Sequence, residues 1–405
     1  MSDPASVPVV PAPLLRDGAF LRLLGAGFAG STLRWHESLA IAIFTFAVTN
    51  SALAVALVVF ARSLPSLFLG IFAGSIADRF DRRWLMLGGQ MMLAISCGVM
   101  TLLAVAGVIE PWHMAVNGFI NGVVFCTEFP VRRTMMGEIA GMGRIGRGMG
   151  IDLTAGNATR IVGPALGGLV YELAGITGTY IVCTIGYMIC LLLLAGLVPP
   201  PRAVIDRAIG IGTRVIEGLR YVRQNRALMS TMAITVAMNI WGFPYAQMVP
   251  VVGRDELDLS AFPIGLLLSS EGVGALAGSL LIAAYGREAH FKKLYLYGAF
   301  ALMVCVAAFG LSRVYELSLV LTLVGGFGIA GFSTMQSTLP YVLSAPEMRA
   351  RVMGVLSVAI GTGPLGVLHL GLLGEWLGAA NALVVVGIEG AVALLLIALI
   401  WREAR

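Results

Sequence analysis

The feature that most constrains this chain is a repeated pattern of apolar runs, each about twenty residues long, separated by short polar segments. Hydrophobic residues make up 58% of the 405 residues and charged residues only 12%, whereas soluble domains carry about 45–50% apolar and ~25% charged residues. A helix needs ~20 apolar residues to cross a bilayer. These proportions exclude an ordinary soluble enzyme and a disordered chain, and they predict an all-α membrane protein with twelve spans. The expected spans are residues 23–47, 51–76, 84–108, 113–131, 150–172, 176–198, 228–252, 262–285, 294–312, 316–340, 352–373 and 378–401.

The distribution of basic residues predicts how these spans are oriented. An even number of spans places both termini on one side of the membrane, and cytoplasmic loops carry an excess of Lys and Arg. Only Arg254 and Arg313 fall in the opposite loops, whereas most of the 27 basic residues fall on the side of the termini. We therefore expect a multi-pass protein of the inner (plasma) membrane with both termini in the cytoplasm. The lipid bilayer accounts for this charge without a nucleic-acid partner.

A long polar interval at residues 199–226 divides the spans into two sets of six. It opens with three prolines and continues as RVIEGLRYVRQNR, in which charged positions recur opposite an apolar face, as in a helix that lies on a membrane surface. Gly-Pro pairs also recur at similar places in the fifth and eleventh spans, as a duplicated unit would leave them. We predict an N-terminal half at 1–198, a cytoplasmic linker with an amphipathic helix at 199–226, and a C-terminal half at 227–405.

The loop between the second and third spans carries the most informative motif, GSIADRFDRR at residues 74–83. It resembles the signature G-x-hydrophobic-small-D-R-x-G-R-R/K of the major facilitator superfamily, with one departure, because Asp81 stands where glycine is usual. A glycine lets two helices approach closely, and an aspartate is favourable at a helix N-terminus. The resemblance implies that this gate loop holds the two halves together in the outward-open state. Its assigned residues are Gly74, Asp78, Arg79, Arg82 and Arg83.

Further segments resemble one branch of that superfamily, the enterobactin exporters and related drug–proton antiporters. Residues 51–83 fit this branch, and GPALGG in the fifth span resembles the antiporter signature G-P-x-x-G-G. Proline removes a backbone hydrogen bond and glycines thin the helix, so we expect a bend and a tight helix crossing. A bent packing helix with no antiporter meaning is the alternative. The motif comprises Gly163, Pro164, Gly167 and Gly168.

The first span departs from the branch. Relatives often carry Gly-Asp-Trp there, whereas this chain has Leu33, Arg34 and Trp35, followed by His36 and Glu37. Charged groups within a span are costly, so they usually face a cavity or one another. Glu37 lies one helical turn after Arg34. It can therefore take over the acidic role, and the alternative is a structural ion pair between these two residues.

Proton-driven antiport needs a carboxylate that binds either a proton or the substrate, and a buried acid can do this. We favour Glu37 first and Glu128 second. Glu128 and Asp152 lie close to the inner ends of their spans, so each can instead balance nearby arginines. His36 is a candidate proton relay, with a buried core histidine as the alternative reading. The candidates for proton coupling or substrate binding are Glu37, Arg34, His36, Glu128, Asp152 and Arg160.

Other classes of site find no support in the sequence. The three G-x-G-x-x-G matches lack the strand and helix of a dinucleotide site, and neither Lys292 nor Lys293 follows a phosphate-binding glycine loop. The four histidines are scattered, so we expect no metal site. We accordingly predict that the chain is not an enzyme, uses no cofactor beyond a proton gradient, and binds a small-molecule substrate as a monomer.

The resemblance implies a major facilitator fold, with two six-helix halves around a central cavity. The expected function is secondary active transport, as a proton-coupled exporter of small amphipathic molecules such as drugs or siderophore-like metabolites. An importer, a metal-ion exporter and a lysolipid translocator of the same fold stay open. A non-transporting membrane scaffold is the remote alternative.

Overall fold

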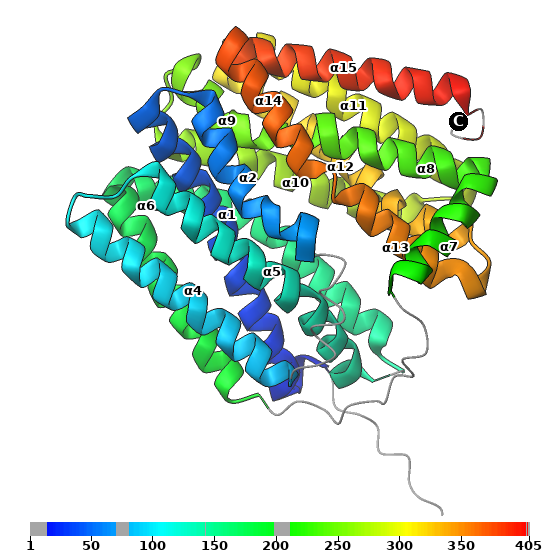
Figure 1. Cartoon of the computed structure of the whole chain (residues 1–405), viewed down its shortest axis with the longest axis horizontal. Coiled ribbons are helices and arrows are strands. Elements are labelled where there is room, and N and C mark those ends of the chain that lie inside the picture. Colours follow the sequence, from blue (N-terminus) through cyan, green and yellow to red (C-terminus); the bar gives the residue numbers. More distant parts are fainter. Residues whose placement is uncertain (1–13, 70–80, 142, 198–210, 402, 404–405) are drawn as a thin grey trace, which may run out of the picture.

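The computed structural model describes residues 14–69, 81–141, 143–197, 211–401 and 403, and these residues form helices joined by short connections (Figure 1). Within this part of the chain there is no β-strand. The first group of helices comprises α1 (Gly18–Thr49), α2 (Ala52–Leu69), α4 (Arg82–Val105), α5 (Pro111–Ala140) and α6 (Ile145–Ala195).

The second group follows the linker. One of its spans consists of α8 and α9 joined by a π-helical turn at Met238–Gly242. Another span is interrupted between α13 and α14. The helices are α7 (Ile211–Gln224), α8 (Arg226–Ala237), α9 (Tyr245–Asp255), α10 (Ala261–Tyr285), α11 (Phe291–Leu311), α12 (Tyr315–Val342), α13 (Arg349–Ile360), α14 (Gly363–Leu377) and α15 (Ala379–Ile400).

The spans predicted from the sequence are present. Nine segments of the described chain are long and apolar enough to cross a membrane. One of them, α6, is 51 residues long and leaves helical geometry at Gly175 (φ 59°, ψ −157°), so it crosses twice. The 32 residues of α1 and the 18 described residues of α2 supply two more spans. The all-α architecture with twelve spans is therefore confirmed.

Polar side chains fix several helix starts. Asp17 accepts hydrogen bonds from the backbone N–H groups at the start of α1, and Asn225 does the same for α8. Asp81 caps α4 by accepting from the N–H groups of Arg83 and Trp84, at 2.9 and 3.3 Å. Such caps stabilise a helix by ~1 kcal/mol. The residue that departs from the superfamily signature thus begins the third span.

The amphipathic helix expected in the linker is present as α7, but its environment differs from the prediction. Instead of facing lipid alone, α7 packs on α13: Val222 is buried, and Glu217 forms an ion pair with Arg351 at 3.0 Å. Gly218 makes this possible, because a Cβ there would lie 2.6 Å from the carbonyl oxygen of Arg351. The helix therefore stands against the second group.

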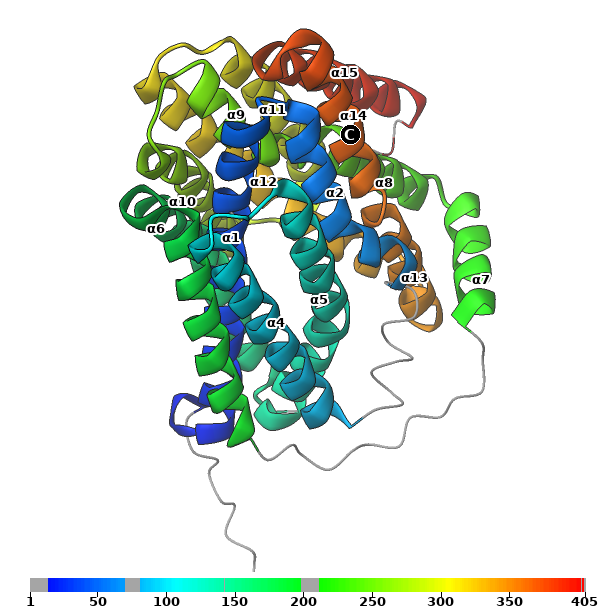
Figure 2. The same cartoon turned by 60° about the vertical axis from the view of Figure 1, so that its left-hand side comes forward.

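The two groups meet at one end and diverge at the other. We call the end that carries the turns at Asn50, Gly175, Asp258 and Gly378 the far side, and the end that carries the chain termini the terminus side. In Figure 1 the groups meet at the upper left, and from there the first runs downward and the second to the right. Figure 2 shows α7 and α13 well away from the lower ends of α4 and α5.

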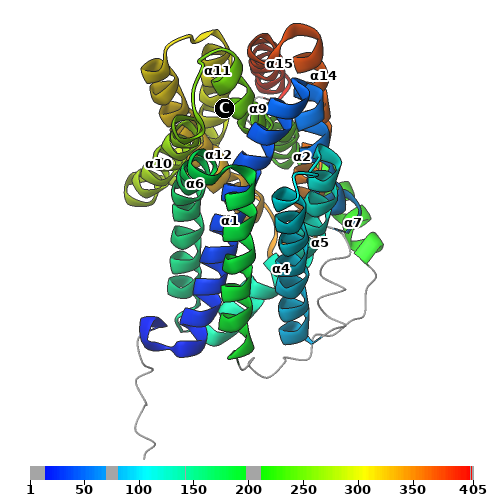
Figure 3. The same cartoon turned by 90° about the vertical axis from the view of Figure 1, so that its left-hand side faces the viewer.

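Two helix pairs join the groups at the far side. On one flank α2 packs on α14, where Ser51 donates to Glu375 at 2.7 Å. On the other flank α6 crosses α10 (Figure 3), and Glu172 accepts hydrogen bonds from Ser260 and from the N–H of Phe262, at 2.7 and 2.8 Å. The structure is therefore closed at the far side.

Candidate functional site

Glu37 lies in the interior of the first group and is only 1% exposed. Two amide groups on α5 hold its carboxylate: Asn117 donates to Oε1, and Asn121 donates to Oε2 at 3.0 Å. The amide of Asn121 also donates to the hydroxyl oxygen of Tyr187 on α6, at 3.3 Å. Uncharged amide groups therefore bind the carboxylate of Glu37, the first proton-coupling candidate, and within the described structure Glu37 forms no ion pair.

Arg34 does not pair with Glu37, although the two residues are one turn apart. Its guanidinium group lies over the ring of Phe125, 4.0 Å from the centroid, and such cation–π contacts strengthen where water is excluded. Arg62 on α2 donates to the backbone oxygen of Arg34 at 3.4 Å. In the described part of the chain neither guanidinium forms an ion pair. The ion-pair alternative for Glu37 and Arg34 is thus not what the structure shows.

A cavity of about 260 Å³ opens between the two groups of helices. Its wall contains Arg34 and Trp35 from α1, Arg62 from α2, Asn121 from α5 and Gln247 from α9. Two of these side chains, Arg34 and Arg62, are cationic. Asn121 belongs to this wall and also holds Glu37, so it links the cavity to the buried acid.

Glu128, the second candidate, is buried on α5. It accepts a hydrogen bond from Gln90 on α4 at 2.8 Å, and it lines a recess together with Arg34 and Tyr187. Its charge lies close enough to Arg34 for the two to interact. Glu128 therefore faces the same interior as Glu37, and within the described structure it forms no ion pair with Arg132 or Arg133.

Asp152 and Arg160 lie two turns apart on α6, but the structure gives them different partners. Asp152 is buried and forms an ion pair with Arg132 on α5, with Arg133 3.9 Å away. Arg160 instead reaches the second group and pairs with Glu271 on α10 at 2.8 Å. Asp152 thus takes the structural role that we kept as its alternative, while Arg160 connects the two groups.

Removing the partner of Asp152 is expected to destabilise the first group. Arg132→Ala leaves the buried carboxylate with only the more distant Arg133, and breaking a buried pair costs ~3–5 kcal/mol. The midpoint of thermal unfolding in detergent should fall clearly. Arg226→Ala is the matched control, because Arg226 pairs with Glu403 at an exposed position, where such pairs contribute about 0–1 kcal/mol. Equal effects of the two substitutions would contradict the structural role of Arg132.

The GPALGG segment brings three helices together. A Cβ on Gly163 would lie 2.4 Å from Trp35, and a Cβ on Gly167 would lie 2.9 Å from His36. Both partners are on α1. A Cβ on Gly168 would lie 2.4 Å from the carbonyl oxygen of Ala261 on α10. The tight crossing expected from the sequence is therefore observed twice, with α1 in the same group and with α10 in the other.

His36 and the gate loop complete the predicted residues. His36 is buried at the crossing of α1 and α6, and it is not among the residues that line the cavity. Of the gate-loop residues, Gly74, Asp78 and Arg79 lie outside the described chain. Arg82 pairs with Glu138 on α5 at 2.6 Å, and Arg83 donates to the carbonyl oxygen of Ala195 at 2.7 Å. Both described arginines thus tie α4 to its own group.

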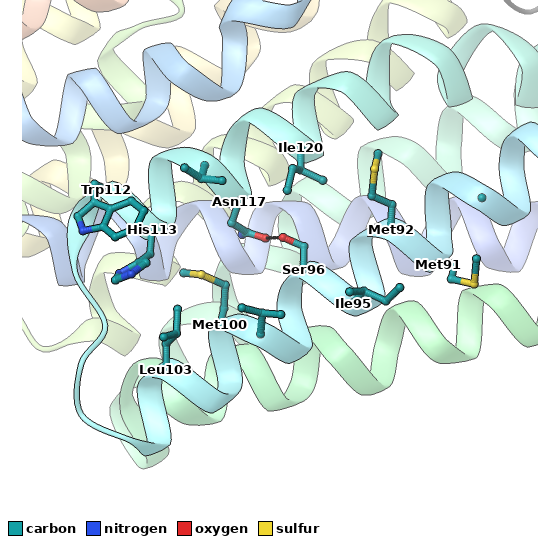
Figure 4. Close-up of a pocket in the computed structure, with 13 residues that line it drawn as sticks. Met91, Met92, Ile95, Ser96, Met100, Leu103, Trp112, His113, Asn117 and Ile120 are labelled. Atoms are coloured by element: carbon teal, nitrogen blue, oxygen red, sulfur yellow. Dashed lines mark hydrogen bonds between the residues drawn. The ribbon is translucent and has the colours of Figure 1, made fainter.

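An apolar groove lies between α4 and α5, and Asn117 is one of its lining residues (Figure 4). Methionine, isoleucine, leucine and valine side chains form most of its wall, and its volume is about 410 Å³. At its floor Ser96 donates to Asn117 at 2.6 Å, as Figure 4 shows. Asn117 in turn donates to Glu37. The groove is therefore separated from the buried acid by one amide side chain.

The sequence analysis missed the two asparagines and the partner of Arg160. Asn117 and Asn121 are four residues apart, so they share one face of α5, and this spacing of amides in an apolar span was a signal that could have been read. Glu271 was visible as an acid within a span, but its pairing with Arg160 depends on how the groups pack. In the described residues no three His, Cys, Asp or Glu side chains come together to hold a metal ion.

The comparisons with solved structures show the same fold. A bacterial homologue of the human lysosomal transporter Spinster, in an inward-facing and unoccupied conformation, matches with a TM-score of 0.75 at 14% identity, over 98% of this chain and 99% of that one. The nucleoside transporter NupG matches with a TM-score of 0.72 at 16% identity, over 95% and 99% of the two chains.

Several relatives by sequence are named as efflux proteins or exporters. The multidrug efflux pump Tap of Mycolicibacterium fortuitum is 26% identical over 86% of this chain and 88% of its own. The enterobactin exporter EntS of Shigella flexneri is 23% identical over 76% and 74%. The family model described as "Transmembrane secretion effector" matches residues 10–405. The chain therefore belongs to this family, in the efflux branch of the major facilitator superfamily, and is an integral membrane transporter.

Proposed function

We propose that this protein exports small amphipathic molecules, of drug or siderophore-like type, in exchange for protons. Relatives named as a multidrug efflux pump, a macrolide efflux protein and an enterobactin exporter support the direction and the substrate type. The observation that best supports proton coupling is the position of Asn121. This residue lines the cavity and also donates a hydrogen bond to the buried carboxylate of Glu37.

The shared asparagine suits an exchange of proton for substrate. A carboxylate in this interior is held by two amide N–H donors, whereas a protonated carboxyl group must itself donate one hydrogen bond. Protonation of Glu37 therefore requires the amides to rearrange, and Asn121 cannot rearrange without changing the cavity wall. Substrate bound against Asn121 favours the arrangement in which the amides donate to the ionised carboxylate. A proton on Glu37 favours the rearranged amides. The positive charges of Arg34 and Arg62 balance the ionised acid.

We further propose that the terminus side is cytoplasmic, as the excess of basic residues on that side indicates. The halves at 1–198 and 227–405 then rock against each other about the central cavity, joined by the linker at 199–226. A structure closed at the far side corresponds to a cavity open to the cytoplasm, where an exporter collects its substrate. The two cationic side chains on the wall make a metal-ion exporter electrostatically unfavourable.

Cells that express the protein and lack their own efflux pumps test the proposal. They are loaded with a panel of fluorescent amphipathic dyes and siderophores and then energised with glucose. We expect at least one compound class to leave the cells faster than from cells carrying an empty vector, and a protonophore to abolish the difference. Faster uptake in place of efflux would identify an importer. Efflux that resists the protonophore would remove the proton coupling.

A further inference from the structure

The pair formed by Arg160 and Glu271 joins the two groups of helices deep within the membrane-spanning part. Glu271 is 5% exposed. One carboxylate oxygen accepts from Arg160 on α6 at 2.8 Å, and the other accepts from the hydroxyl group of Tyr245 on α9. The guanidinium group of Arg160 lies 5.4 Å from the ring centroid of Trp35, which lines the central cavity. Glu271 is thus buried, and Arg160 lies beside a residue that lines the cavity.

The pair belongs to a single line of contacts along the two helices. Residues Arg160, Pro164, Gly168 and Glu172 follow one another at intervals of four on α6, so they share one face. Pro164 contacts Gly265 and Gly168 contacts Ala261, both on α10, and Glu172 accepts a hydrogen bond from Ser260, the residue just before α10. Because one face of α6 makes all these contacts, separating the groups at the far side also separates Arg160 from Glu271.

Few other ionisable groups face Glu271. Arg160 approaches from α6 and Tyr245 from α9, and Cys305 on α11 lies near Tyr245. Helix α12 contacts Glu271 through Gly326, which has no side chain. A Cβ on Gly326 would lie 2.2 Å from the backbone oxygen of Glu271. Once the groups separate, Glu271 therefore loses its only nearby cationic partner among these residues. A buried carboxylate without a counter-charge is costly, and it neutralises by taking up a proton.

We propose that Glu271 is a second proton-binding residue of this transporter. It binds a proton while the far side is open, and it loses that proton when the groups close and Arg160 comes within reach. The O–H bond of the carboxyl group then breaks, the proton passes to water in the cavity beside Trp35, and the carboxylate pairs with Arg160. This inference rests on the proposed proton-coupled export, because it supplies the step that releases the proton on the terminus side.

The test measures far-side opening directly. Ile264 is fully buried between α1 and α10, so a cysteine placed there by Ile264→Cys reacts with a membrane-impermeant maleimide, added from the far side, only when the groups separate. Labelling is counted above that of the parent chain. Because only the thiolate form of a cysteine reacts, each labelling rate is divided by the rate of a free thiol, glutathione, measured at the same pH. We expect this normalised labelling rate to rise about tenfold between pH 8 and pH 5.5, a typical size for the coupling between two sites.

Variants of the pair isolate the cause. Glu271→Gln mimics the protonated acid, so its labelling should be fast at both pH values. Arg160→Gln should also give fast labelling, and the exchanged pair Arg160→Glu with Glu271→Arg should restore slow labelling at pH 8. Glu316→Gln is the control, because Glu316 is exposed in the first turn of α12, within the second group; it should keep the response to pH. A tenfold response that persists in Glu271→Gln would overturn the proposal.

The outcome is separable from that of the proposed function. If no compound is exported but labelling responds to pH only when Glu271 is present, Glu271 binds a proton and the export proposal fails alone. If proton-coupled export is observed and Glu271→Gln changes neither labelling nor the number of protons exchanged per substrate, the present proposal fails alone.

Discussion

A Glu37→Gln variant is expected to exchange substrate across a membrane but to lose all accumulation driven by a proton gradient. The glutamine amide has the size of the carboxyl group and cannot lose or gain the proton. The interior can accept it, because Oδ1 of Asn121 has no hydrogen-bond partner within the described structure, so a flipped Asn121 can receive the new N–H group. The fold should therefore persist, with Asn121 and the cavity wall held in the arrangement that the protonated acid favours, while the coupling disappears.

Proteoliposomes separate these two activities. Counterflow of labelled substrate, with equal pH on both sides, should stay within about twofold of wild type, and gradient-driven accumulation should fall to background. Glu316→Gln, at an exposed position in the first turn of α12, is the matched control and should retain both activities. Gradient-driven accumulation that survives in Glu37→Gln would remove Glu37 from the coupling mechanism.

A Gly168→Val variant is expected to abolish transport by preventing closure at the far side. The new side chain would meet the carbonyl oxygen of Ala261 at the place where α6 crosses α10. Overpacking at such a contact costs about 1–3 kcal/mol, and only the closed state bears this cost. The equilibrium should therefore shift toward the open state by ~5- to 150-fold.

The measurement is the rate of maleimide labelling of a cysteine at Ile264, together with transport. Gly156→Val is the matched control, because Gly156 lies on the same helix and no atom comes within 4 Å of a Cβ placed there. The control should transport normally and label slowly. Normal transport by Gly168→Val would show that the close approach of α6 and α10 is not needed for the cycle.

The fold could be predicted from the sequence because the membrane imposes a simple rule on it. Each span must satisfy its backbone hydrogen bonds internally, so apolar runs and basic loops are enough to place twelve helices. The break in the long helix α6 at Gly175 matches the boundary predicted between the fifth and sixth spans. The environment of α7 differs from the prediction, because its amphipathic pattern suits a protein surface as well as a lipid surface.

The site was predictable in part, for a physical reason. Glu37 stood out as an acid in an apolar span, and the structure shows it buried. Its partners did not stand out, because side chains on α1 and α5 meet only through packing between helices distant in sequence. Asp152 and Arg160 share a helix face, yet each found a partner on another helix. A periodicity shows which residues share a face, but it does not show what that face meets.

The central claim is that substrate moves outward as protons move inward, and everted membrane vesicles test it most directly. With the interior acidified and followed by a pH-sensitive dye, compounds from the efflux panel are added outside. We expect one compound class to release protons from the vesicles, and vesicles carrying Glu37→Gln to show no release. Absence of release for every compound, with folded protein present and substrate still transported, would contradict proton-coupled export.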